Sequence, residues 1–156
     1  MSTVFLAILM FSVVANVYAC TNLYEERELD SMGFSGYETI NPNSLAYPLK
    51  RIGEKIYTTI LSQEKEQEFF NKVYDRRFRE LVYIINSEKT GFLVETTNRY
   101  NTTVGGIKAM EDASSLQNDF RTNIIILENL RDRYEANSTY WMLIQQAIDT
   151  TNSVTI

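Results

Sequence analysis

The chain has 156 residues, a formal net charge of −5, no histidine and one cysteine. The absence of histidine excludes Ser-His-Asp and Cys-His catalysis and every zinc site that needs imidazole. A single cysteine excludes an internal disulfide and a cysteine-rich metal site, and the acidic balance argues against nucleic-acid binding. The length and the apolar fraction of 44% are typical of one globular domain.

Residues 1–19 predict a cleaved signal peptide. They carry no charged side chain and are mostly apolar from Val4 to Val17. Val17 and Ala19 suit the small pockets of a signal peptidase, so we expect cleavage after Ala19. The run is shorter than the about 20 apolar residues of a membrane span; an uncleaved anchor or a buried helix is the alternative. We therefore expect a secreted, extracellular protein with no membrane span after cleavage.

Cys20 would then be the first residue of the mature chain. An odd thiol in an oxidising compartment favours an intermolecular disulfide, which would link a dimer or a complex with another protein. A free or capped thiol is the alternative. A lipid anchor is disfavoured, because Tyr18 is bulky and no Lys or Arg precedes the apolar run.

Two N-glycosylation sequons agree with export. They begin at Asn101 and Asn137, and each has the pattern Asn-x-Ser/Thr. Both fall where we expect breaks between helices, in positions that can accommodate a glycan. We predict modification of at least one.

The helices are predicted from apolar side chains that recur every three or four residues. Residues 20–43 are expected to be irregular, apart from one or two helical turns in their acidic beginning. The apolar series Leu45, Leu49, Ile52, Ile56 and Ile60 has a helical period, and we expect the helix itself at 48–61. A second helix, at 63–88, begins after Ser62 as its N-cap and ends before Gly91.

Three further helices follow. The region 92–110 has a helical apolar pattern, but Gly105-Gly106 costs about 1–2 kcal/mol inside a helix, so we expect weakening or a kink there. A central helix runs from 116 to 136. Asn137 or Ser138 caps the last helix, which carries Trp141, Ile144 and Ile148.

These amphipathic helices cannot bury their apolar faces alone and must pack on one another. We therefore predict an all-α protein, an antiparallel bundle of four to five amphipathic helices after an irregular N-terminal segment. The expected divisions are the signal peptide 1–19, the irregular segment 20–43, the bundle 44–152 and a tail 153–156.

The charged residues contain no recognised catalytic motif. Glu64 and Glu68 share a helix face and could form an acid–base pair, but a solvated first turn is the simpler interpretation. The cluster 75–80 could bind an anion; we interpret it as surface pairs that join Asp75 to Arg79 and Arg76 to Glu80. The segment Gly105-Gly106-Ile107-Lys108 lacks the spacing of a phosphate loop. We predict no catalytic, metal or cofactor site.

The tyrosines and Trp141 suit an interface but are more often half-buried core at helical spacing. The motifs identify no family, and secreted helical families held by several disulfides are excluded. We expect a non-enzymatic protein that binds an extracellular protein partner. The alternatives are a carrier of a small hydrophobic ligand or lipid, a carboxylate-dependent enzyme, and a membrane-surface protein.

Overall fold

The structure is a computed structural model, and it describes residues 24–60, 63–108 and 114–155. The predicted signal peptide and Cys20 lie outside the described residues. All regular secondary structure in the described ranges is helical, which confirms the all-α prediction. The helices are α2 (Glu26–Ser31), α3 (Tyr47–Ile60), α4 (Gln63–Asn86), α5 (Leu93–Lys108), α6 (Gln117–Arg131) and α7 (Thr139–Asn152), with single 3₁₀ turns at Thr90–Phe92 and Ser114–Leu116.

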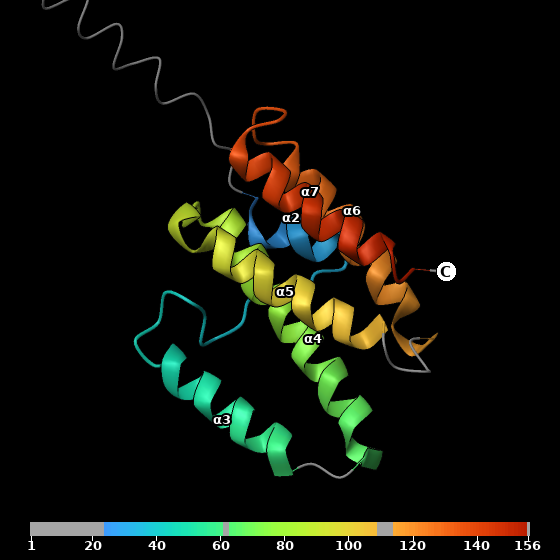
Figure 1. Cartoon of the computed structure of the whole chain (residues 1–156). Coiled ribbons are helices and arrows are strands. Elements are labelled where there is room, and N and C mark those ends of the chain that lie inside the picture. The colour runs from blue at the N-terminus through green and yellow to red at the C-terminus, as the bar shows by residue number, and fades with distance from the viewer. Residues whose placement is uncertain (1–23, 61–62, 109–113, 156) are drawn as a thin grey trace, which may run out of the picture.

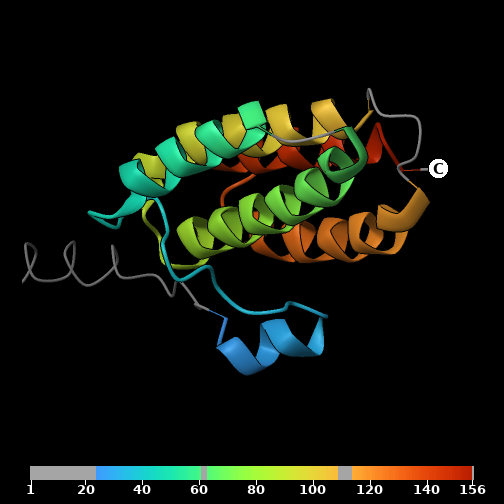
Figure 2. The ribbon, with the colours of Figure 1, turned by 90° about the horizontal axis from the view of Figure 1, so that it is seen from below.

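Helices α4 to α7 form an antiparallel four-helix bundle (Figure 1). Helix α4 packs against α5 and α6, and α7 closes the bundle by packing against both α5 and α6. Helix α3 lies outside this bundle along α4, and α2 lies on the opposite side (Figure 2). No described helix combines the length and apolar character that a membrane crossing needs.

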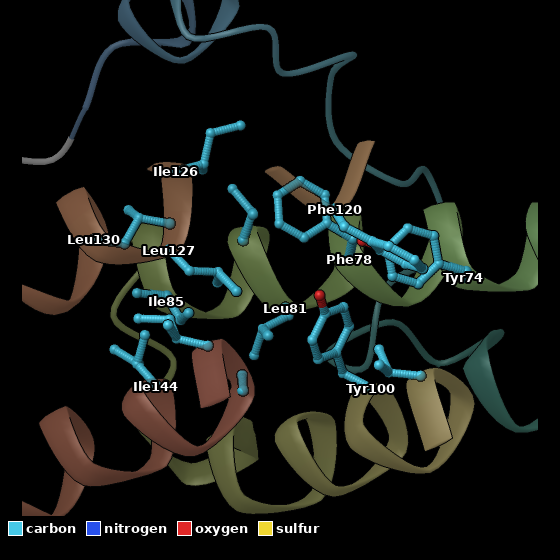
Figure 3. Packing of buried hydrophobic residues seen from close by; sticks show 14 of the residues in the cluster. Tyr74, Phe78, Leu81, Ile85, Tyr100, Phe120, Ile126, Leu127, Leu130 and Ile144 are labelled. Atoms are coloured by element: carbon cyan, nitrogen blue, oxygen red, sulfur yellow. The ribbon is translucent and has the colours of Figure 1, made fainter. Parts of the chain in front are cut away.

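The core lies between α4, α5, α6 and α7 and is filled by large apolar side chains that the helical periodicity predicts (Figure 3). Full burial of each such side chain stabilises the fold by about 1.5–3 kcal/mol. The labelled members are Tyr74, Phe78, Leu81, Ile85, Tyr100, Phe120, Ile126, Leu127, Leu130 and Ile144.

Local signals in the sequence explain two of the helix limits. Ser138 caps α7, because its hydroxyl accepts a hydrogen bond from the backbone N–H of Trp141 at 3.3 Å. Helix α5 continues through Gly105 and Gly106 to Lys108, since the buried neighbours Val104 and Ile107 hold this turn against the core. Packing therefore offsets the low helix propensity of the two glycines.

The N-terminal segment is tied to the bundle by the buried side chain of Asn86. Its amide donates to the backbone carbonyl of Tyr24 at 2.9 Å and to the hydroxyl of Tyr37 at 2.7 Å. Its oxygen accepts from the backbone N–H of Tyr24 and from Arg133. Leu29 of α2 is fully buried in the core, so this segment is part of the folded domain.

Candidate functional site

Helix α3 turns its apolar side to the solvent. Leu49, Ile52 and Ile56 of α3 and Leu45, two residues before it, are all more than half exposed, and together we call them the apolar stripe. The side chain of Ile60 lies outside the described part. The expectation that this series packs into the bundle is therefore wrong for α3, although it holds for α4 to α7. An exposed row of large aliphatic side chains is a candidate for a binding site.

The opposite, polar side of α3 contacts the bundle. Tyr47 is buried, and the side chains of Lys50 and Glu54 are only 10% and 9% exposed. The surface of α4 that meets them carries Arg77 and Glu80. Helix α3 is inverted because this α4 surface is ionic, and only the polar side of α3 can satisfy those charges.

Glu80 is the centre of this buried ion cluster. Its carboxylate accepts hydrogen bonds from Lys50 Nζ at 2.8 Å, from the Tyr47 hydroxyl at 2.9 Å and from Arg77 Nη1 at 2.7 Å to each oxygen. Arg77 also pairs with Glu54, and Arg99 donates to the Tyr47 hydroxyl at 2.8 Å. The side chains of Glu80 and Arg77 are 0% and 1% exposed. The cluster thus attaches α3 to α4 and, through Arg99, to α5.

The protonation states of the cluster follow from its contacts. Burial favours the neutral acid of Glu80, but the Arg77 charge and the hydrogen bond from Lys50 outweigh it and lower the pKa of Glu80. Burial and the neighbouring Glu80 raise the pKa of Tyr47 to about 12. Burial opposes the charge of Arg77, yet Glu80 and Glu54 raise the pKa of its guanidinium. At neutral pH Glu80 and Arg77 are therefore charged, and Tyr47 is a neutral phenol.

The pairs predicted from the 75–80 segment are partly present. Arg79 pairs with Asp75 at 2.6 Å, as predicted. The prediction that Arg76 pairs with Glu80 is wrong, since Arg76 lies 3.7 Å from Glu54 and Glu80 is occupied by the cluster. The sequence spacing places Arg76 and Glu80 on one face of α4, but both contact residues of α3 instead of each other.

Three surface hollows flank α3. One of about 590 Å³ lies between α3 and the first half of α4, where Tyr57 and Phe69 meet Lys65 and Lys72. A second, of about 370 Å³, lies on the other side of α3 and is lined by Ile52 and aromatic residues of α4. A third, of about 490 Å³, continues from it towards α5 and shares Arg51, Val73 and Arg77 with it. The stripe therefore stands beside a trough between α3 and α5.

The carboxylate candidate for catalysis finds no support in this geometry. Glu68 is exposed and pairs with Lys72 at 2.6 Å. The hydrogen bond from Lys72 and its charge lower the pKa of Glu68, whereas a general acid requires a raised pKa. The side chain of Glu64 lies outside the described part.

The two sequons occupy different environments. Asn101 lies within α5 and not at a helix break, so its expected position is wrong. Its side-chain oxygen and nitrogen are buried, and neither has a hydrogen-bond partner among the described residues. Asn137 is exposed in the turn between α6 and α7 with a φ of 65°. The folded protein thus offers room for a glycan at Asn137.

The tyrosines divide between core and surface. Tyr74 and Tyr100 are buried and bond to Asn123 and Thr151, each at 2.7 Å. Burial raises the pKa of both, that of Tyr100 to about 12. Tyr57 of α3 is 54% exposed and stacks near Phe69. Only the exposed tyrosines are accessible to a partner.

The inverted orientation of α3 had a signal in the sequence. Tyr47, Lys50 and Glu54 recur at intervals of three and four, and thus form a polar face as regular as the apolar one. The next helix offers Arg77 and Glu80 at an interval of three. The polar face of α3 and the charged pair on α4 carry opposite charges that can pair with one another. Comparison of the two helices therefore predicts a buried ion network between them.

This arrangement defines an all-α domain in which one helix, α3, turns its apolar side to the solvent. A family described as a domain of unknown function (DUF5667) matches residues 39–137. The match covers more than half of the chain, so the chain belongs to this family. The matched residues include α3 to α6, and therefore the apolar stripe and Glu80. Searches of curated proteins and of solved structures gave no match.

Proposed function

We propose that this chain is a secreted, glycosylated and non-enzymatic binding protein that engages a protein partner through the apolar stripe of α3. The observation that carries the proposal is the inverted helix: Leu49, Ile52 and Ile56 of α3, together with Leu45 just before it, face the solvent while the polar side of α3 is fixed by buried charges. An ion cluster that fixes α3 keeps the stripe in one position, so little conformational freedom is lost when a partner binds.

The test is a comparison of matched variants in an affinity capture. Ile52→Glu places a charge in the stripe, and Ile125→Glu places the same charge on α6; the two isoleucines are 56% and 53% exposed. Each protein is immobilised under reducing conditions, so that disulfides through Cys20 do not contribute. We expect proteins retained by the wild type and by Ile125→Glu to be lost with Ile52→Glu. Identical retention by all three would contradict the proposal.

A small hydrophobic ligand or lipid is the second candidate, favoured by the 370 Å³ hollow. Ile52, Phe69, Phe70 and Val73 line it, and most of its lining is apolar. Its size is at the lower end of the range for ligand pockets. A thermal-shift screen with fatty acids distinguishes the two candidates. Carrier function predicts stabilisation that a Val73→Trp replacement abolishes, whereas a protein-binding function predicts no shift.

A further inference from the structure

The hollow of about 590 Å³ between α3 and the first half of α4 is separate from the apolar stripe, because none of the stripe residues lines it. Its volume lies within the range of ligand pockets. Both helices contribute the side chains that determine its chemistry, namely Glu54 and Tyr57 from α3 and Lys65, Phe69, Lys72 and Arg76 from α4. A carboxylate, two aromatic rings and a row of cations therefore surround one space.

The nearly buried carboxylate of Glu54 directs one oxygen into this hollow. Its Oε2 accepts a hydrogen bond from Arg51 at 2.7 Å and pairs with Arg77, and both arginines line the hollows on the other side of α3. Its Oε1 is buried and has no hydrogen-bond partner among the described residues. Arg76 Nη1, on the side of the 590 Å³ hollow, lies 3.7 Å from Oε1, which is too long for a hydrogen bond. A buried oxygen of this kind is stabilised by a donor from a ligand.

The gap between Glu54 and Arg76 matches a neutral hydroxyl group. A hydroxyl donates its hydrogen to Oε1 of Glu54 and accepts a hydrogen bond from Nη1 of Arg76. An ammonium group has no acceptor for Arg76 and carries the same charge, whereas a carboxylate would meet the charge of Glu54. This end of the hollow therefore favours a hydroxyl over either ion.

The middle of the hollow is aromatic and open. The rings of Tyr57 and Phe69 have centroids 5.2 Å apart and planes tilted by 46°. Gly53 also lines the hollow, and a Cβ added there would meet nothing within 4 Å. A further ring can pack on such a pair with offset or edge-to-face geometry. The middle therefore favours a flat aromatic group.

The end of the hollow nearest the start of α4 is basic. Lys65 lies 11 residues before Arg76, so the two are about 16 Å apart along the helix axis. Lys72 pairs with Glu68 at 2.6 Å, and together with Lys65 these side chains leave one net positive charge. Lys50, the remaining cation of the described lining, already donates three hydrogen bonds within the protein. This end therefore favours an anionic group such as a carboxylate.

We infer that the 590 Å³ hollow binds a hydroxylated aromatic acid. The hydroxyl lies between Glu54 and Arg76, the rings pack against Tyr57 and Phe69, and the acid group meets the charge of Lys65. The inference goes beyond the proposed function and does not depend on the apolar stripe, so either can fail without the other.

The experiment is a fluorescence titration of a hydroxynaphthoate whose hydroxyl and carboxylate stand at opposite ends of the rings. For a ligand of this size we expect saturable binding with a Kd of about 1 mM or below. The methoxy analogue cannot donate to Glu54, and the carboxamide analogue has no charge for Lys65. Each should bind at least about tenfold more weakly, as expected for the loss of a hydrogen bond to a charged group.

Two variants with matched controls locate the binding. Gly53→Leu fills the hollow, and Arg76→Met keeps the stem of the side chain but removes its donors; each should weaken binding at least about fivefold. The controls are Gly91→Leu, where an added Cβ also meets nothing within 4 Å, and Arg121→Met at an exposed position of α6. Both controls should bind as the wild type does. Circular dichroism of the four variants checks that the helical fold is retained.

Four results would overturn the inference. The first is no saturable binding up to about 10 mM. The second is binding that Gly53→Leu and Arg76→Met leave unchanged, because the probe then lies elsewhere. The third is equal affinity for the methoxy or the carboxamide analogue, which would remove the contact with Glu54 or with Lys65. The fourth is displacement of the probe by inorganic phosphate at the same concentration, because the aromatic rings would then contribute nothing.

Discussion

Replacement of Glu80 by glutamine tests the buried ion cluster most directly. The glutamine amide has the shape of the carboxylate but no charge. Glu80 accepts hydrogen bonds from Lys50, Tyr47 and Arg77, so the NH₂ group of the glutamine would face donors and could not replace these bonds. Arg77 is 1% exposed and cannot turn to the solvent. Glu54 still pairs with it, so part of its charge remains compensated.

The expected loss of stability follows from this burial. Removal of one partner of a buried pair costs about 3–5 kcal/mol, because the remaining charge stays desolvated. With Glu54 retained, we expect the lower end, about 3 kcal/mol. For a domain of this size that loss lowers the melting temperature by about 10 °C.

Urea unfolding followed by circular dichroism measures this loss. The matched control is Asp75→Asn, which removes the 2.6 Å pair with Arg79 at a surface position where the aspartate is 47% exposed. An exposed pair of this kind contributes no more than about 1 kcal/mol, and salt should weaken it further. A Glu80→Gln variant that unfolds within about 1 kcal/mol of the wild type would refute the buried-pair reasoning.

Four other measurements test separate features. Because the pKa of Glu80 is lowered in the folded protein, its contribution to stability is present above the ordinary pKa of glutamate and is lost as the pH falls through the lower value; urea unfolding between about pH 5 and pH 2 should show a steeper decline for the wild type than for Glu80→Gln. The pKa of Tyr47 is about 12 in the folded protein, against an ordinary value of 10. Its contribution to stability is therefore present below pH 10 and disappears as the pH rises towards 12. A loss of helical signal that coincides with a rise of tyrosinate absorbance would confirm this. Gly105 has nothing within 4 Å of an added Cβ, so Gly105→Ala should raise the unfolding free energy by about 1 kcal/mol, and a lower value would mean that this turn is not helical in solution. Glycopeptide mass spectrometry should find a glycan on Asn137 and none on Asn101, whose amide is buried; occupancy at Asn101 in folded protein would contradict the placement of α5.

Periodicity predicts most of the fold, because helices α4 to α7 bury the side that their apolar residues define. The same rule gives the wrong orientation for α3. Periodicity identifies two faces of a helix but does not say which one the rest of the protein can accept. Near Arg77 and Glu80 the bundle offers charges, and desolvation of those charges against Leu49 or Ile52 would cost more than exposure of the aliphatic side chains. Part of the deciding information lies in a different helix, so the orientation of α3 can be predicted only when the charges of α3 and α4 are considered together.

The candidate site was therefore present in the sequence as residues but not as a surface. The sequence pattern predicts Leu49 and Ile52 in the core and Glu80 in a local pair with Arg76. The prediction for Asn101 is wrong for a similar reason, since Gly105-Gly106 predicts a weakened helix nearby and tertiary packing maintains it.

The attachment of Tyr24 has a consequence for the order in which the chain folds. Asn86, which holds it, is 62 residues further along, and Arg133, which steadies Asn86, is 47 residues beyond that. Tyr24 and the residues beside it can therefore make these contacts only after Arg133, which follows α6, has been synthesised. Until then, Leu29 and its neighbours are accessible to chaperones and proteases. In a chain truncated before Arg133 they would remain accessible.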